Sequence, residues 1–99
     1  MADLQRAQIN GFEMAYLDEG QGPPILFVHA FPLDHTMWSD QIEAFKGSNR
    51  IIAPDLRGFG QSDVTPGPYT MDLLADDLAS LLNHLGLDDV VYCGLSLGG

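Results

Sequence analysis

The sequence is poor in basic residues and in cysteine. Lys and Arg together number 4 against 14 Asp and Glu, which gives a formal net charge of −10 at pH 7. Such a chain lacks the basic face that binds nucleic acid and the basic residues that draw a protein to anionic lipid. The single cysteine, Cys93, excludes an internal disulfide and fits a reducing compartment. We therefore expect no nucleic-acid partner, no membrane partner and a cytoplasmic location.

Long hydrophobic runs are also missing. No apolar run approaches the roughly 20 residues that cross a bilayer. The first residues show no basic start followed by an apolar stretch, so we expect no signal peptide. What is present is typical of a globular chain, with 45% hydrophobic and 18% charged residues over a length of 99.

The spacing of apolar residues predicts a hairpin followed by buried strands. Asn10-Gly11 separates two alternating segments, which is a strong signal for a β-hairpin. Three later segments are apolar on both faces, as strands of a covered parallel sheet are. The hairpin strands are predicted at residues 7–9 and 12–17, and the buried strands at 25–28, 51–53 and 90–93. Cys93 is predicted to be a small core residue rather than a thiol nucleophile.

Two segments between these strands show helical spacing. Trp38, Ile42 and Phe45 recur at i, i+4 and i+7, which predicts a helix over residues 34–46 with Gly47 as its stop. Thr70 is the predicted N-cap of a second helix that Gly86 ends. Its apolar face is predicted to hold Met71, Leu74, Ala75, Leu78, Leu81, Leu82 and Leu85, and its polar face Asp72, Asp76, Asp77, Ser80 and Asn83. The order of elements predicts an α/β fold: a hairpin, then parallel βαβαβ.

The last predicted strand runs directly into Gly94-Leu95-Ser96-Leu97-Gly98. This G-x-S-x-G pattern is typical of a nucleophile elbow, and it follows a strand as that motif requires. The serine would sit on a sharp, strained turn that lifts its hydroxyl off the sheet, and the two glycines avoid collisions with neighbouring backbone. The alternative interpretation is an ordinary turn serine.

Two further motifs follow the other two buried strands: His29-Ala30-Phe31-Pro32, and Asp-Leu-Arg-Gly-Phe-Gly-Gln-Ser-Asp at residues 55–63. In this order and spacing the three motifs resemble the oxyanion loop, the Asp-x-Arg-Gly loop and the elbow of the α/β-hydrolase family. The resemblance covers residues 11–99 and points to the esterase, enol-lactonase and cofactor-free haloperoxidase branch. Dehalogenases and epoxide hydrolases of the family place an aspartate where Ser96 stands, which disfavours them.

The resemblance implies a role for each residue of the site. Ser96 would be the acyl-accepting nucleophile, and the backbone N–H groups of Phe31 and Leu97 would be the oxyanion donors. The side chains of Phe31, Leu95 and Leu97 would line an apolar acyl pocket, with ordinary core packing as the alternative. The implied substrate is a small carboxylic ester or lactone, hydrolysed through an acyl-enzyme. We expect no cofactor and no metal, because no His, Cys or acidic residues have metal-ligand spacing.

Other polar residues are expected to serve the structure. By the resemblance, His29 braces the oxyanion loop. His35 is predicted to be a surface residue rather than part of a pocket mouth, and His84 a solvated residue of the second helix. Asp55 and Arg57 are predicted to form an ion pair or cap that holds the loop at residues 58–60.

One position departs from the family, which usually has glycine where this chain has Ala30. If that position needs a positive φ, alanine would be strained by about 1 kcal/mol or more.

In this fold the catalytic acid and histidine follow the nucleophile along the chain, but only Leu97, Gly98 and Gly99 follow Ser96. We therefore expect residues 1–99 to be a partial domain, the N-terminal part of an α/β-hydrolase sheet truncated at the elbow and inactive alone. The last strand would then have an open edge, which predicts self-association. The alternatives are a non-catalytic remnant or interaction module, and an anion-binding loop at residues 94–99, which the lack of a nearby lysine disfavours.

Overall fold

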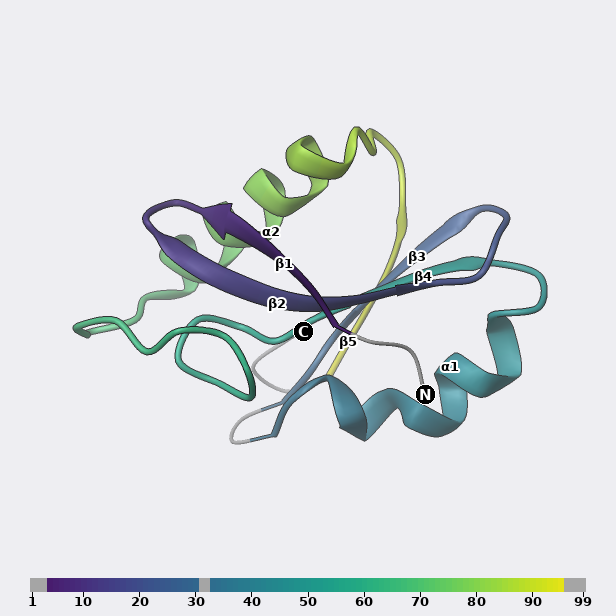
Figure 1. The fold of residues 1–99 in the computed structure, drawn as a ribbon, viewed down its shortest axis with the longest axis horizontal. Helices are drawn as coiled ribbons and strands as arrows, with labels where there is room; N and C mark the ends of the chain where they lie inside the picture. The colour runs from purple at the N-terminus through teal and green to yellow at the C-terminus, as the bar shows by residue number, and fades with distance from the viewer. Residues whose placement is uncertain (1–3, 31–32, 96–99) are drawn as a thin grey trace.

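Alternating side chains place apolar groups on both faces of one sheet, and a helix covers each face. The computed structural model describes residues 4–30 and 33–95 (Figure 1). Its strands are β1 (Gln5–Ile9), β2 (Phe12–Glu19), β3 (Pro24–Val28), β4 (Arg50–Pro54) and β5 (Val91–Gly94). Its helices are the 3-10 helix η1 (His35–Trp38), α1 (Ser39–Phe45) and α2 (Met71–Leu85). Figure 1 shows α2 on one face of the sheet and α1 on the other.

The sheet has the order β1-β2-β4-β3-β5. β1 and β2 form the predicted antiparallel hairpin, and both Asn10 and Gly11 at its turn have positive φ. β2 pairs antiparallel with β4, whereas β3 pairs parallel with β4 on one side and with β5 on the other. The predicted α/β fold is confirmed. Because β4, β3 and β5 are parallel neighbours, their carboxyl ends meet at one edge of the sheet.

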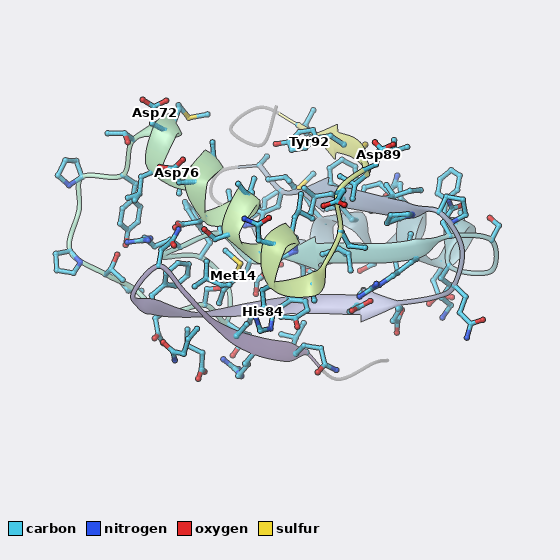
Figure 2. All side chains as sticks on the ribbon, turned by 90° about the horizontal axis from the view of Figure 1, so that it is seen from above. Met14, Asp72, Asp76, His84, Asp89 and Tyr92 are labelled. Carbon is cyan, nitrogen blue, oxygen red and sulfur yellow. The ribbon has the colours of Figure 1, made fainter. Side chains whose placement is uncertain are left out.

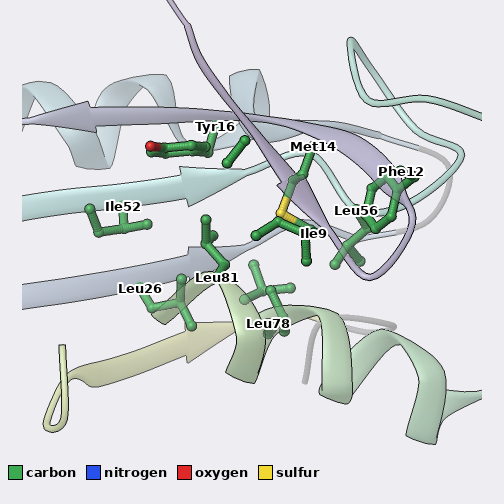
Figure 3. Packing of buried hydrophobic residues seen from close by; sticks show 11 residues of the cluster. Ile9, Phe12, Met14, Tyr16, Leu26, Ile52, Leu56, Leu78 and Leu81 are labelled. Carbon is green, nitrogen blue, oxygen red and sulfur yellow. The ribbon is translucent and has the colours of Figure 1, made fainter. Parts of the chain in front are cut away.

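Adjacent strand residues enter two separate cores. Leu26 packs in the core beneath α2, together with Met14 and Leu81 (Figure 3). Phe27, the next residue, enters the core on the α1 side, where its ring lies 5.0 Å from that of Trp38. This alternation is why β3 is apolar at every position: both of its faces are covered.

Helix α2 begins and ends where the sequence predicts, but its buried face differs. The Thr70 hydroxyl accepts a hydrogen bond from the Leu73 N–H, and Gly86 closes the helix with φ of 71°. Asp77, predicted on the polar face, is fully buried, whereas Met71 and Ala75, predicted on the apolar face, are exposed. The correction has a physical reason: Asp77 lies in the same i, i+3, i+4 stripe as the buried leucines and pairs there with Arg57. Asp72, Asp76 and the solvated His84 lie along the exposed side (Figure 2).

The first predicted helix is divided into η1 and α1. The Asp34 carboxylate accepts the Thr36 N–H and caps η1, and α1 then continues to Phe45. Trp38 and Ile42 are buried as predicted, but Phe45 is 44% exposed. The helix ends at Phe45 with Lys46 as its C-cap, just before the predicted stop at Gly47, and Gly47 does not adopt a positive φ.

Strand β5 is not the buried strand that its composition predicts. It has one neighbour, β3, among the described strands, and the side chains of Val91 and Tyr92 are 62% and 49% exposed. Cys93 is half-buried and packs against the core on the α1 side. Within the described part of the chain, no helix has the length and apolar character needed to cross a membrane.

Candidate active site

The three motifs leave the sheet at the same edge. Val28 at the end of β3 is paired with Gly94 at the end of β5, so the residues that follow them leave the sheet side by side. Asp55 follows β4, on the other side of β3. The sheet therefore brings together the starts of all three loops, although their sequence positions are far apart.

The central residues of the predicted site lie outside the described residues. These are Ser96, the predicted nucleophile, and Phe31 and Leu97, the predicted oxyanion donors. Leu95, predicted to line an acyl pocket, is described, and its side chain is 54% exposed at the end of β5.

His29 links two of the three loops from a fully buried position. Its Nε2 accepts the N–H of Leu56 at 2.9 Å, so Nδ1 carries the proton and donates to the Ala30 carbonyl at 3.0 Å. The ring also packs edge-on against Phe59 in the loop after β4. His29 therefore braces the loop, as the resemblance implied, and both ring nitrogens are engaged.

Ala30 is held at its N–H and its carbonyl. Its N–H donates to the Met37 sulfur at 3.1 Å, and its carbonyl accepts the Leu33 N–H at 2.8 Å in addition to the His29 proton. Asn10 is the only non-glycine residue with positive φ among the described residues, so Ala30 avoids the left-handed conformation. Alanine therefore carries no left-handed strain where the family usually has glycine.

Asp55 does not pair with Arg57; of the ion pair or cap that we predicted, its carboxylate forms the cap, at the N–H of Gln61. Its fully buried carboxylate accepts the His35 N–H at 2.8 Å and the His35 Nδ1 proton at 2.7 Å on Oδ1, and the Gln61 N–H at 2.8 Å on Oδ2. Its main-chain carbonyl accepts the hydroxyl of Ser62 at 2.6 Å. His35 is thus mostly buried against Asp55 and is not the surface residue that we predicted.

The electrostatics favour a charged pair at His35 and Asp55. The hydrogen bond to Asp55 raises the pKa of His35 above its ordinary value; burial opposes this, and the charges of Asp55 and Asp34 add to it. Burial alone would raise the pKa of Asp55, but hydrogen bonds from the His35 ring, from the Gln61 N–H and from the His35 N–H bring it below its ordinary value. Both shifts stabilise an imidazolium beside a carboxylate.

Arg57 instead anchors its loop to α2. Its Nη2 and Nε donate to the two carboxylate oxygens of Asp77 at 2.8 and 3.0 Å, a two-pronged geometry that suits guanidinium and carboxylate. The guanidinium also lies 4.4 Å from the centre of the Phe12 ring, and Asn10 donates to Asp77 at 3.1 Å. This cluster joins the hairpin, the loop after β4 and α2.

Sequence reasoning missed three residues that organise this edge: Asp77, Ser62 and the His35 side chain as a partner of Asp55. Gly60 is the nearest signal, because a Cβ on it would overlap the Asp55 carboxylate. A glycine at this position indicates that the loop packs closely against another group, but it does not identify that group as the Asp55 carboxylate.

The fold brings Asp34, His35 and Asp55 together although Asp55 is distant in sequence, and their ligand atoms lie within 4.8 Å of one another. All three already have partners in the protein. Asp34 accepts the N–H and hydroxyl of Thr36, and His35 Nδ1 donates to Asp55. We assign no metal to this group.

A cavity of about 220 Å³ lies between β2 and the η1–α1 segment. Its lining residues are Leu17, Glu19, His35, Thr36, Ser39, Ile42 and Glu43. Leu95 is not among them, and the other two residues predicted to line the acyl pocket, Phe31 and Leu97, lie outside the described residues.

Comparisons with known proteins match this chain to one protein family and to several relatives. Residues 23–99 match the family model described as "alpha/beta hydrolase fold". The chain is 43% identical over 91 residues to the non-heme chloroperoxidase CPO-A1 of Kitasatospora aureofaciens, covering 91% of this chain and 33% of that protein. It is 33% identical over 97 residues to 3-oxoadipate enol-lactonase 2 of Acinetobacter baylyi, covering 98% of this chain and 36% of that protein.

A solved structure is similar over nearly the whole chain. A thermophilic esterase from Thermogutta terrifontis superposes with a TM-score of 0.89 at 48% identity, covering 98% of this chain and 38% of that one. The chain thus spans about a third of the length of the relatives that it matches.

Proposed function

The chain belongs to the α/β-hydrolase fold family, and on that premise we propose that its parent protein is a serine hydrolase acting on a small carboxylic ester or lactone. The observation that carries this proposal is the register of β3 and β5. Val28 is paired with Gly94. The segment that begins at Gly94 and leads to Ser96 therefore starts beside the loop that His29 braces. An acyl-transfer site needs this juxtaposition of a nucleophile and an oxyanion loop.

In the proposed mechanism the Ser96 hydroxyl attacks the carbonyl carbon of the substrate while a general base takes its proton. The C–O bond to the leaving alcohol breaks, and the alcohol oxygen receives that proton. Water then attacks the acyl carbon and gives a proton to the base; the C–O bond to Ser96 breaks, Ser96 takes up that proton, and the acid leaves. The acid and base of the triad follow the serine in this fold, so in this proposal they come from parts of the parent protein beyond residue 99.

The proposed oxyanion donors are the N–H groups of Phe31 and Leu97. Support comes from Ala30, whose carbonyl is held by both His29 and Leu33. A carbonyl and the next N–H share one planar peptide, so we propose that fixing the Ala30 carbonyl orients the Phe31 N–H. Phe31, Leu95 and Leu97 are the proposed lining of the acyl pocket.

Ser96 also separates this proposal from epoxide opening. The resemblance associates epoxide hydrolysis with an aspartate at the nucleophile position, where this chain has serine. The single Cys93 suits a reducing compartment, and we propose the cytoplasm as the location.

The test uses the protein encoded by the gene that carries this sequence. Ser96→Ala should abolish labelling by a fluorophosphonate and reduce hydrolysis of p-nitrophenyl acetate and of a simple lactone by on the order of 10⁶-fold in kcat. Ser48→Ala, at an exposed serine in the turn after α1, is the matched control and should retain both. Undiminished hydrolysis by the Ser96→Ala protein would overturn the proposal.

A second candidate concerns the 99-residue chain by itself. The exposed side chains of Val91 and Tyr92 on the edge strand β5, and of Leu95 directly after it, favour self-association with a second copy. In that case the chain acts as an interaction module without catalysis.

A further inference from the structure

We propose that His35 and Asp55 form a clasp that positions the loop after β3 against the loop after β4, and that closure of this clasp sets the geometry of the active-site edge. Its consequence for catalysis rests on the proposed hydrolase function. The clasp itself involves only described residues and is tested separately.

One carboxylate joins three points of the chain. Asp55 directly follows β4, and its Oδ1 accepts both the main-chain N–H and the Nδ1 proton of His35, at 2.8 and 2.7 Å. Its Oδ2 accepts the N–H of Gln61 at 2.8 Å, from the far side of its own loop. The carboxylate has no solvent exposure, so no water competes for these hydrogen bonds.

The clasp is also connected to Ala30. The helix η1 begins with His35, and its Met37 sulfur accepts the Ala30 N–H. Leu33, two residues before His35, donates its N–H to the Ala30 carbonyl. Movement of η1 away from Asp55 would therefore disturb the peptide groups on both sides of Ala30.

Gly60 leaves the clasp little room to rearrange. It has φ of 51°, and a Cβ there would overlap the Asp55 carboxylate and approach the Asp34 side chain. The loop after β4 can therefore close over the carboxylate only with glycine at this position.

The charged groups that act on His35 are acidic. Asp55, in the loop after β4, and Asp34, before η1, both favour its charged form. Glu19 and Glu43 line the same cavity, and Glu43 is paired there with Lys46. No lysine or arginine is among the residues that line the cavity beside His35 in the described structure. This surrounding favours the protonated imidazole.

The pH range of the clasp follows from the two pKa shifts. The pKa of His35 is raised by its hydrogen bond to Asp55, so its contribution is complete below the unfolded value of 6.5 and is lost as pH rises through the higher folded value. The pKa of Asp55 is lowered despite burial, so its contribution is present above 3.8 and is lost as pH falls through the lower folded value. The charged clasp is therefore complete between the folded pKa of Asp55 and that of His35, and it weakens above the latter because His35 loses its charge.

The first experiment observes the clasp without catalysis. In the histidine-labelled parent protein, the His35 ring resonance, assigned by its loss in His35→Ala, should titrate above the value of a histidine peptide. Asp55→Asn should lower that titration point and speed the hydrogen exchange of the His35 and Gln61 amides. A His35 ring that titrates at the peptide value in both proteins would overturn the clasp.

The second experiment separates positioning from simple stability. His35→Asn keeps an N–H donor near the place of Nδ1 but has no titratable charge, whereas His35→Ala lacks both. His35→Ala should lower kcat by on the order of 10²-fold, the cost of about 1 Å of misplacement, with KM changed far less. His35→Asn should recover kcat to the level that the wild type keeps above the His35 pKa, because both then hold a neutral N–H donor, and it should lack the alkaline change in activity.

His84→Ala is the matched control, because His84 is an exposed histidine on α2 and lies outside the clasp. A His35→Ala protein with the wild-type kcat and pH profile would overturn the positioning role. If Ser96 fails to react with the fluorophosphonate while His35 still titrates high, the hydrolase proposal falls and the clasp stands.

Discussion

At the scale of single residues, the most consequential groups are buried charges. Asp77 is fully buried, and its carboxylate is matched on both oxygens by Arg57. Such a pair adds little net stability compared with apolar residues, but loss of one partner leaves a charge without compensation. The pair therefore makes the hairpin, the loop after β4 and α2 depend on one another.

We expect Asp77→Ala to lower the free energy of unfolding by about 3–5 kcal/mol, because Arg57 would remain buried without its partner. Urea denaturation followed by circular dichroism measures this. The control is Asp76→Ala, at the exposed neighbour, which should change the free energy by about 0.5 kcal/mol or less. Equal effects of the two substitutions would contradict the importance of the pair.

His35 and Asp55 have the same character at the other side of the loop. Whereas Arg57 holds the loop to α2, Asp55 holds it to η1. Asp55 and Arg57 are only two positions apart, yet the first is bound to η1 and the second to α2. The sequence alone left an ion pair or a cap open for Asp55 and Arg57, and it could not indicate that their partners are His35 and Asp77.

At the scale of elements, α2 is the part of the structure that local sequence predicts best. Its N-cap, its first-turn acid and its glycine C-cap all lie where the sequence places them. Caps are local interactions, because donor and acceptor are separated by only three or four residues. The helix face is different, because which residues are buried depends on the strand or loop that the helix meets.

We expect Thr70→Ala to destabilise the protein by about 1 kcal/mol, because the N–H of Leu73 would lose its acceptor at 3.1 Å. Thr70→Ser keeps the hydroxyl and should retain most of the stability. Thermal unfolding of the three proteins, together with amide exchange at Leu73, gives the comparison. If Thr70→Ser is as unstable as Thr70→Ala, the cap is not the source of the effect.

At the scale of the whole molecule, the chain covers about a third of the relatives that it matches, and β5 is an edge strand in its sheet. Each copy carries a net charge of −10. Two copies therefore repel each other through their charge while their exposed β5 strands favour pairing.

We expect the 99-residue chain to associate more strongly as salt increases, because salt screens the repulsion over about 8–10 Å at 0.1–0.15 M. Sedimentation velocity at low and high salt over a range of concentrations measures this. Val91→Lys should weaken association, since it places a charge on the edge. Val64→Lys, at an exposed valine in the loop after β4, is the control, and a purely monomeric chain at high salt would refute the prediction.

The sequence by itself determined the features that depend on neighbours along the chain. Asn10-Gly11 specifies the hairpin turn, the fully apolar β3 requires a sheet covered on both faces, and Thr70 and Gly86 delimit α2. The order of the three motifs was sufficient to indicate the family. These inferences hold because turn, cap and strand preferences act over a few residues.

Only the tertiary structure decided which charged groups meet. His35 pairs with Asp55, and Arg57 with Asp77, and in both cases the partners are 20 residues apart in sequence. The open edge of the last strand was expected from the sequence, but the exposure of the Val91 and Tyr92 side chains became apparent only in the sheet, because the same apolar residues would suit a central strand. Such partners are selected by which segments the sheet brings side by side, and local preferences carry no record of that choice.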